Sequence, residues 1–217
     1  DCPAMTAVPA RRLPRRFYAR DSLEVAPELL NKVMVAGSRA GRIVEVEAYR
    51  GGDDPASHAF RGPSRRNATM FGPPGHLYVY FTYGMHWCAN AVCMPAGTAQ
   101  AVLIRALEPL AGIEEMRVAR PGARRDLELC AGPARLCQAL GVDGRCDGVD
   151  LVARDTPVWI GSDGVPPPDA PAVGPRIGIR QGTEHEFRFW VPESKAVARF
   201  RPVGPPRSQR LRSSPRR

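Results

Sequence analysis

The sequence predicts an α+β fold: one domain built on a curved, mostly antiparallel β-sheet with flanking helices and a protruding β-hairpin. Its 217 residues suit a single hydrophobic core. Short runs that alternate apolar and polar residues, as half-buried strands do, recur between turns rich in glycine and proline, and only a few segments carry helix-start signals. No period of 20–50 residues repeats, which argues against a solenoid or propeller.

The charge distribution divides the chain into a domain and two basic ends. Four arginines against one aspartate in residues 1–16, and five arginines in residues 204–217, account for +8 of the net charge of +9. We expect both ends to be disordered segments around a nearly neutral domain, residues 17–203. No apolar run approaches the ~20 residues of a membrane span, and residues 1–16 lack the apolar stretch of a secretory signal.

The first third of the domain reads as a helix followed by a hairpin. Asp21 is an N-cap signal for a helix over residues 22–31. Two β-like runs, residues 33–36 and 42–49, flank a glycine-containing turn. Alternation along the second run puts one set of side chains on one face, namely Ile43, Glu45, Glu47 and Tyr49, and leaves Val44, Val46 and Ala48 on the other.

The remaining elements follow from turn and cap signals. Residues 50–75 form a long loop of the kind that is usually functional, and residues 76–82 pair with a return strand from Met85, which leaves Tyr83 at the tip. In order, we then expect a strand at 101–107, a helix from Pro109 to Ala119, a helix between Gly132 and Gly141, strands at 149–152, 157–160, 176–179 and 187–191, and a proline-rich loop at 165–175.

The six cysteines do not indicate a metal site. Cys2, Cys88, Cys93, Cys130, Cys137 and Cys146 form no Cys-x-x-Cys pair and lack the histidine spacing of zinc sites. In a chain with a normal apolar fraction they predict buried, reduced thiols, which indicates an intracellular compartment.

An acid-free stretch predicts a polyanionic partner. Residues 55–107 contain no Asp or Glu but carry Arg61, Arg65, Arg66 and Arg105 together with tyrosines. Phosphate backbones and stacked bases favour such a surface. Ordinary solvated arginines are the alternative interpretation.

Several side chains could carry chemistry. Glu47 and Tyr49 would place a carboxylate beside an aromatic plate if their face lines a pocket, whereas an exposed strand edge is the commoner arrangement. Tyr83, at a turn, could wedge into a base stack or fold back on its own hairpin. Arg105 lies on an otherwise apolar strand and needs an anion, for which Glu47 is a candidate.

Four runs, residues 41–49, 67–90, 103–109 and 129–140, resemble the alkyladenine (3-methyladenine) DNA glycosylase family in its bacterial form. The likeness spans about residues 16–202. It implies that Glu47 is the general base that activates water and that Arg105 helps to hold that water. It further implies that Tyr49, His58 and Tyr80 sandwich the flipped base, and that the backbone amide of His58 donates to the six-position of the purine. Asn90 would crowd the two-amino group of guanine, and Ile177 would supply main-chain contacts near the water. Tyr83 would fill the gap in the duplex, and the residues that would contact DNA are Met85, His86 and Arg66.

The resemblance implies a repair enzyme that hydrolyses alkylated or deaminated purines, 3-methyladenine and also hypoxanthine and ethenoadenine, from double-stranded DNA without a cofactor. Only Lys32 and Lys195 could form a Schiff base and neither lies near the cluster, so we expect a monofunctional enzyme without lyase activity. The elements of a zinc deaminase are absent. We expect a monomer in the bacterial cytoplasm, associated with the nucleoid. An inactive DNA-damage binding protein and an RNA- or nucleoside-processing enzyme remain alternatives.

Overall fold

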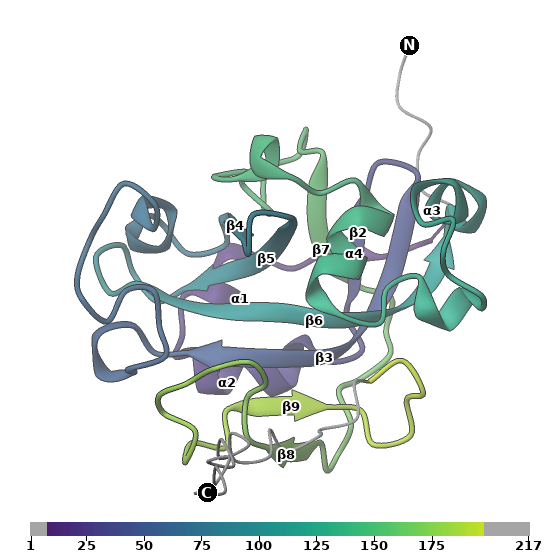
Figure 1. Ribbon diagram of the computed structural model, residues 1–217. Helices are drawn as coiled ribbons and strands as arrows, with labels where there is room; N and C mark the ends of the chain where they lie inside the picture. The colour runs from purple at the N-terminus through teal and green to yellow at the C-terminus, as the bar shows by residue number, and fades with distance from the viewer. Residues whose placement is uncertain (1–7, 198–217) are drawn as a thin grey trace, which may run out of the picture.

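The computed structural model describes residues 8–197, which form one curled antiparallel sheet with helices packed against it (Figure 1). The strands are β1 (Arg11–Arg12), β2 (Val33–Ala36), β3 (Arg39–Tyr49), β4 (Leu77–Thr82), β5 (His86–Cys93), β6 (Gln100–Ala111), β7 (Val158–Ser162), β8 (Ala172–Gly174) and β9 (Arg188–Trp190). The α-helices are α1 (Arg15–Tyr18), α2 (Ser22–Leu29), α3 (Ile113–Ala119) and α4 (Pro133–Leu140), and the 3-10 turns are η1 (Gly51–Asp53), η2 (Ala68–Phe71), η3 (Asp126–Glu128) and η4 (Gly144–Cys146). The predicted α+β class is confirmed.

The strands follow the order β1-β7-β2-β3-β6-β5-β4, with β9 paired to β3 and β8 to β9. Each of these pairs is antiparallel. Long central strands β3 and β6 lie side by side, and a single apolar cluster joins them to α2 and α4 through residues such as Leu29, Val46, Ile104 and Leu136. Among the described residues, no helix has the length and apolar character that a membrane crossing requires.

A β-bulge changes the predicted faces of β3. The register with β6 shifts between Ile43 and Glu45, so that Val44 is an extra residue on its strand. Ile43 therefore packs in the main core with Val46 and Ala48, while Val44 joins a separate cluster with Ala106. The predicted placement of Ile43 and Val44 is wrong, because a bulge after Ile43 reverses the alternation at that point.

The predicted helix start at Pro109 is also wrong. The strand β6 continues to Ala111, and Pro109 lies opposite Gly41 on β3. Gly112 then turns the chain with φ +67°, and α3 begins at Ile113. Strand pairing with β3 therefore outweighs the local preference of proline for a first helical turn.

Two predicted strands in the C-terminal third do not form. Residues 149–152 turn beside β4, where Leu77 N donates to the carbonyl of Val149 over 2.8 Å. Residues 176–179 form a loop against β3, with Gly178 at φ +81°. The predicted strands at 157–160 and 187–191 correspond to β7 and β9, whereas β8 lies within the predicted proline-rich loop.

The basic N-terminal segment is ordered where it is described. Arg11 and Arg12 pair with β7, and the Arg15 guanidinium lies 2.6 Å from Asp150. The prediction of disorder is therefore wrong for these residues, because β7 offers an edge that the segment covers. Residues 1–7 and the predicted basic tail lie outside the described residues.

Burial of the thiols is confirmed for most of the cysteines. Cys88, Cys93, Cys130 and Cys137 are buried free cysteines, Cys146 is half-buried, and Cys2 lies outside the described residues.

Candidate active site

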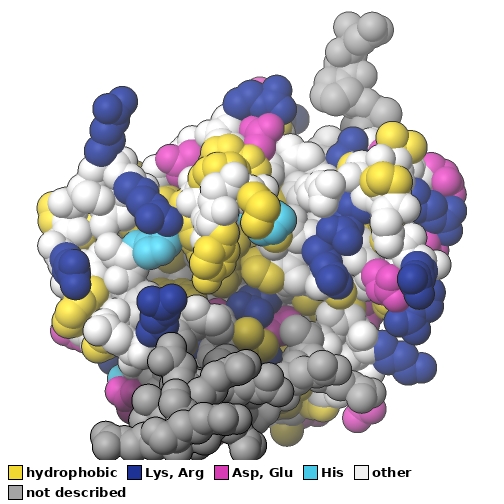
Figure 2. Space-filling view, in the orientation of Figure 1, with side chains coloured by type: hydrophobic (Ala, Val, Ile, Leu, Met, Phe, Trp, Pro, Cys, Tyr) yellow, Lys and Arg dark blue, Asp and Glu magenta, His cyan; other side chains and the backbone are white. Residues whose placement is uncertain are grey.

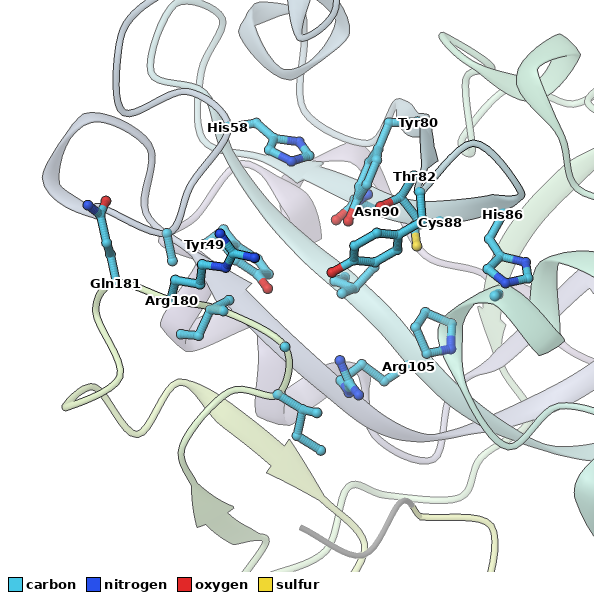
Figure 3. A pocket seen from close by; sticks show the side chains of 18 of the residues that line it. Tyr49, His58, Tyr80, Thr82, His86, Cys88, Asn90, Arg105, Arg180 and Gln181 are labelled. Atoms are coloured by element: carbon cyan, nitrogen blue, oxygen red, sulfur yellow. The ribbon is translucent and has the colours of Figure 1, made fainter. Parts of the chain in front are cut away.

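A cavity of about 640 Å³ opens on the face shown in Figure 2, where basic side chains surround a hollow. Its walls come from β3 to β6, from the loop after η1, from the loop before β9 and from the start of α4. The lining residues include Tyr49, His58, Tyr80, Tyr83, His86, Cys88, Asn90, Arg105, Ile177 and Arg180, most of them labelled in Figure 3.

Arg105 lines this cavity and contacts two carboxylates that are buried behind it. Arg105, on β6, places Nη1 3.1 Å from Oε1 of Glu47 and Nε 2.9 Å from Oε1 of Glu45. Glu45 also accepts from Nη1 of Arg188 over 3.1 Å. The expected pairing of Arg105 with Glu47 is confirmed, and charges of alternating sign follow one another across three strands.

Glu47 lies behind the cavity wall and is itself fully buried. Besides Arg105, it accepts from the backbone N–H of Ile177 over 2.7 Å and from the Tyr49 hydroxyl over 2.9 Å. Burial raises the pKa of Glu47, although Arg105 and these two donors act in the opposite direction. The carboxylate is thus a stronger base than an exposed one, yet two hydrogen-bond donors and the Arg105 cation stabilise its ionised form.

Tyr49 forms one wall, and a second buried ion pair supports it from behind. The Arg176 guanidinium lies 4.7 Å from the centre of the Tyr49 ring. Its Nη2 donates to Oδ1 of Asp54 over 2.7 Å, and its Nη1 donates to the carbonyl of Ala48 over 3.0 Å. Asp54 follows η1 and Arg176 precedes Ile177, so this pair ties together two loops that line the cavity.

His58 and Tyr80 form the facing wall, and both point into the same part of the cavity as Tyr49 (Figure 3). Their ring centres are 4.5 Å apart and nearly perpendicular. Nδ1 of His58 lies 3.0 Å from the hydroxyl of Tyr78, which fixes the ring. Partial desolvation and the nearby Arg66 cation lower the pKa of His58, so its ring is neutral at pH 7.

Asn90 lies deeper in the cavity, on β5. Its side chain is 4% exposed, and Nδ2 donates to the carbonyl of Tyr78 over 3.1 Å. Because this bond fixes the amide, Asn90 presents a rigid polar edge to any ligand between the aromatic walls.

The hairpin between β4 and β5 carries an exposed apolar tip. Tyr83 and Gly84 have φ of +52° and +66°, and Met85 N donates to the carbonyl of Thr82, as in a type I′ turn. Tyr83 is 81% exposed and Met85 69% exposed. A tyrosine in a left-handed conformation is uncommon, and here the turn directs it to the rim of the cavity rather than into the core.

The structure gathers most of the predicted site residues at one cavity. Tyr49, His58, Tyr80, Tyr83, His86, Asn90, Arg105 and Ile177 line it, and Glu47 lies directly behind them. Met85 and Arg66 are not part of the lining: Met85 is at the tip, and the Arg66 guanidinium lies 5.6 Å from the centre of the Tyr80 ring.

Sequence reasoning missed the side chains that support the site. Glu45 and Glu47 are two residues apart on β3, and this spacing indicates from the sequence that the two side chains share a face. Arg188, Arg176 and Asp54 gave no such signal, because each meets its partner only through distant pairing of strands or loops.

Comparisons with known proteins identify the family of this chain. The family model described as Methylpurine-DNA glycosylase (MPG) matches residues 16–195. A protein of Burkholderia lata, named "Putative 3-methyladenine DNA glycosylase", is 60% identical over 191 residues, which cover 88% of this chain and 92% of that protein. A Streptomyces avermitilis protein of the same name is 49% identical over 210 residues, covering 94% of this chain and 99% of that protein. The chain therefore belongs to the methylpurine-DNA glycosylase family.

Proposed function

We propose that this protein is a DNA repair enzyme that flips methylated purines such as 3-methyladenine out of double-stranded DNA and hydrolyses their glycosidic bond. Family membership and the names of the relatives support a DNA glycosylase. The single observation that carries the proposal is the buried Glu47–Arg105 pair beneath a cavity walled by Tyr49, His58 and Tyr80. A flipped base needs aromatic faces, and its removal needs a base beside them.

In the proposed reaction Glu47 accepts a proton from the water that attacks the sugar. A carboxylate has about four sites for donors, and Glu47 accepts two hydrogen bonds besides its ion pair with Arg105, so a site for water remains. Arg105 lines the cavity and is placed to hold that water and the ionised Glu47 together. The flipped base stacks between the aromatic walls, with ~1–3 kcal/mol per contact offsetting the cost of flipping.

The substrate class follows from the number of acids. A cationic methylated purine is already a good leaving group, so one carboxylate suffices where most glycosidases use two. Among the residues that line the cavity, none is Asp or Glu that could protonate a neutral base. We therefore propose cationic purines as the main substrates, with hypoxanthine and ethenoadenine as slower ones.

We also propose a monofunctional hydrolase that leaves an abasic site. Strand cleavage through a Schiff base requires an amine at the reacting sugar. Lys32 and Lys195 are both absent from the cavity lining, and Lys32 instead lies against the carbonyl of Val165.

The experiment is to incubate the protein with methylated duplex DNA, and separately with duplexes carrying hypoxanthine or ethenoadenine. Released base is measured directly, and strand breaks are measured with and without alkali. We expect free 3-methyladenine and breaks only after alkali. Tight binding without any released base would favour a damage-binding protein of the same fold, and breaks without alkali would refute the monofunctional assignment.

Tyr83→Ala should weaken binding to a damaged duplex by ~1–3 kcal/mol, because the exposed ring at the hairpin tip no longer fills the gap left by the flipped nucleotide. Titration by fluorescence anisotropy measures the change. Val118→Ala is a matched control, since Val118 on α3 is similarly exposed. The affinity of Tyr83→Ala for a duplex whose lesion is already extruded in a bulge should fall less. Equal losses of affinity for both substrates would contradict the role of Tyr83 as a wedge.

Asn90→Ala should admit guanine, since it removes a fixed amide from the cavity wall. We expect the release of guanine from undamaged DNA to rise by about 10- to 200-fold relative to the release of 3-methyladenine. Both bases are quantified from the same reaction by chromatography. An unchanged ratio would place discrimination at another residue.

A further inference from the structure

Arg105 is held between two carboxylates, although the proposed reaction uses only one. Its Nε lies 2.9 Å from Glu45 and its Nη1 lies 3.1 Å from Glu47. The two glutamates are two residues apart on β3, so their side chains leave the strand on the same face. Because all three groups are buried, each charge acts strongly on the others.

Glu45 differs from Glu47 in its partners. Both carboxylates are fully buried, but Glu47 accepts hydrogen bonds from Tyr49 and Ile177, which line the cavity, whereas Glu45 accepts from Arg105 and from Arg188. Its Oε1 accepts from Arg105 and also from Arg188, whose guanidinium lies 4.2 Å from the centre of the Trp190 ring. Glu45 therefore compensates two buried guanidinium charges, and its contact with Arg105 also fixes the group that reaches Glu47.

We propose that Glu45 is a positioning residue for the reaction: it fixes the Arg105 guanidinium against Glu47 and takes up part of its positive charge, so that Glu47 remains basic enough to accept a proton from water. This inference rests on the proposed role of Glu47. Without Glu45, Arg105 would keep a single carboxylate partner and would turn its full charge toward it.

The electrostatics around Glu47 give the sign of the expected effect. Burial raises the pKa of Glu47, Arg105 and the donors from Ile177 and Tyr49 lower it, and Glu45 raises it. The other titratable or charged groups that face this cluster are Tyr80 on β4, Cys88 on β5, Arg176 in the loop before β9, and Arg188 on β9. Loss of the charge on Glu45 should therefore lower the pKa of Glu47.

The test is the pH dependence of single-turnover release of 3-methyladenine from methylated duplex DNA, at saturating enzyme. In the wild type, the rate should fall as the pH drops through the pKa of Glu47, because the protonated acid cannot accept a proton. In Glu45→Gln this acid limb should move to lower pH. The plateau rate should fall severalfold, since the base is weaker. Affinity for the damaged duplex should not change.

Two further variants separate this effect from a general disturbance of the site. Tyr49→Phe keeps the ring but removes a donor to Glu47, so its acid limb should move to higher pH. Asp163→Asn removes a carboxylate from Arg42, which also lies on β3, and should leave the limb unchanged.

If the rate of Glu45→Gln falls at the same pH as the rate of the wild type, the inference is overturned. If that variant does not fold, Glu45→Asp decides the matter: it keeps the charge but retracts it, so the limb should stay in place while the plateau falls. A wild-type plateau in Glu45→Asp would also overturn the inference. If the wild type itself releases no purine, the proposed function fails first, and this outcome is distinct from a normal rate with an unshifted limb.

Discussion

Glu47→Gln should lower the single-turnover rate of base release by ~10²–10⁴-fold, the usual contribution of a general base. The amide oxygen can still accept from the N–H of Ile177, the Tyr49 hydroxyl can accept from the amide NH2 instead of donating, and Arg105 keeps Glu45 as a partner, so the variant should fold. Because Glu47 does not line the cavity, affinity for the damaged duplex should stay close to that of the wild type. Rapid-quench excision beside an anisotropy titration measures both quantities.

The residual rate of this variant should also lose its acid limb. Burial raises the pKa of Glu47, so wild-type activity should be present above that pKa and disappear as the pH falls through it. A glutamine does not titrate, and its rate should be flat over the same range. Glu108→Gln is the matched control, since Glu108 lies on β6 outside the cavity lining, where it accepts from Ser194. Retention of most of the wild-type rate in Glu47→Gln would remove Glu47 as the base.

The parts of the site that could be predicted from sequence depend on local alternation. Glu45, Glu47 and Tyr49 alternate along one strand, so their common face survives the bulge that precedes them. The position of the bulge itself could not be predicted, because neither Ile43 nor Val44 differs chemically from an ordinary core residue. The position of Tyr83 at the tip of the hairpin could be predicted, because Tyr83-Gly84 separates two runs of alternating apolar and polar residues that pair as β4 and β5.

The support behind Tyr49 could not be predicted, because it depends on contacts between distant loops. Arg176 was expected on a strand, yet its pairing with Asp54 and with the carbonyl of Ala48 holds that segment as a loop. The same pairing presents the N–H of Ile177 to Glu47. Arg11 and Arg12 were likewise assigned to disorder from composition, which carries no information about the open edge of β7.

Asp54→Asn should lower the free energy of unfolding by ~3–5 kcal/mol, because it leaves the Arg176 cation buried without its anion. Both side chains are at most 1% exposed, so water cannot replace the lost carboxylate. Urea denaturation at pH 7 measures the loss. Asp126→Asn is a matched control at the surface, where Asp126 pairs with Arg117 and a loss below ~1 kcal/mol is expected.

The pH dependence of this loss tests its electrostatic origin. Although burial by itself raises the pKa of Asp54, hydrogen bonds and charge from Arg176 outweigh it and hold that pKa below its usual value. A carboxyl with a lowered pKa in the folded state contributes stability above its unfolded pKa and loses it as the pH falls through the folded value. The gap between the wild type and Asp54→Asn should therefore narrow on acidification. A gap that stays constant with pH, or a loss no larger than that of Asp126→Asn, would mean that the carbonyls of Ala48 and Gly182 satisfy Arg176 without Asp54.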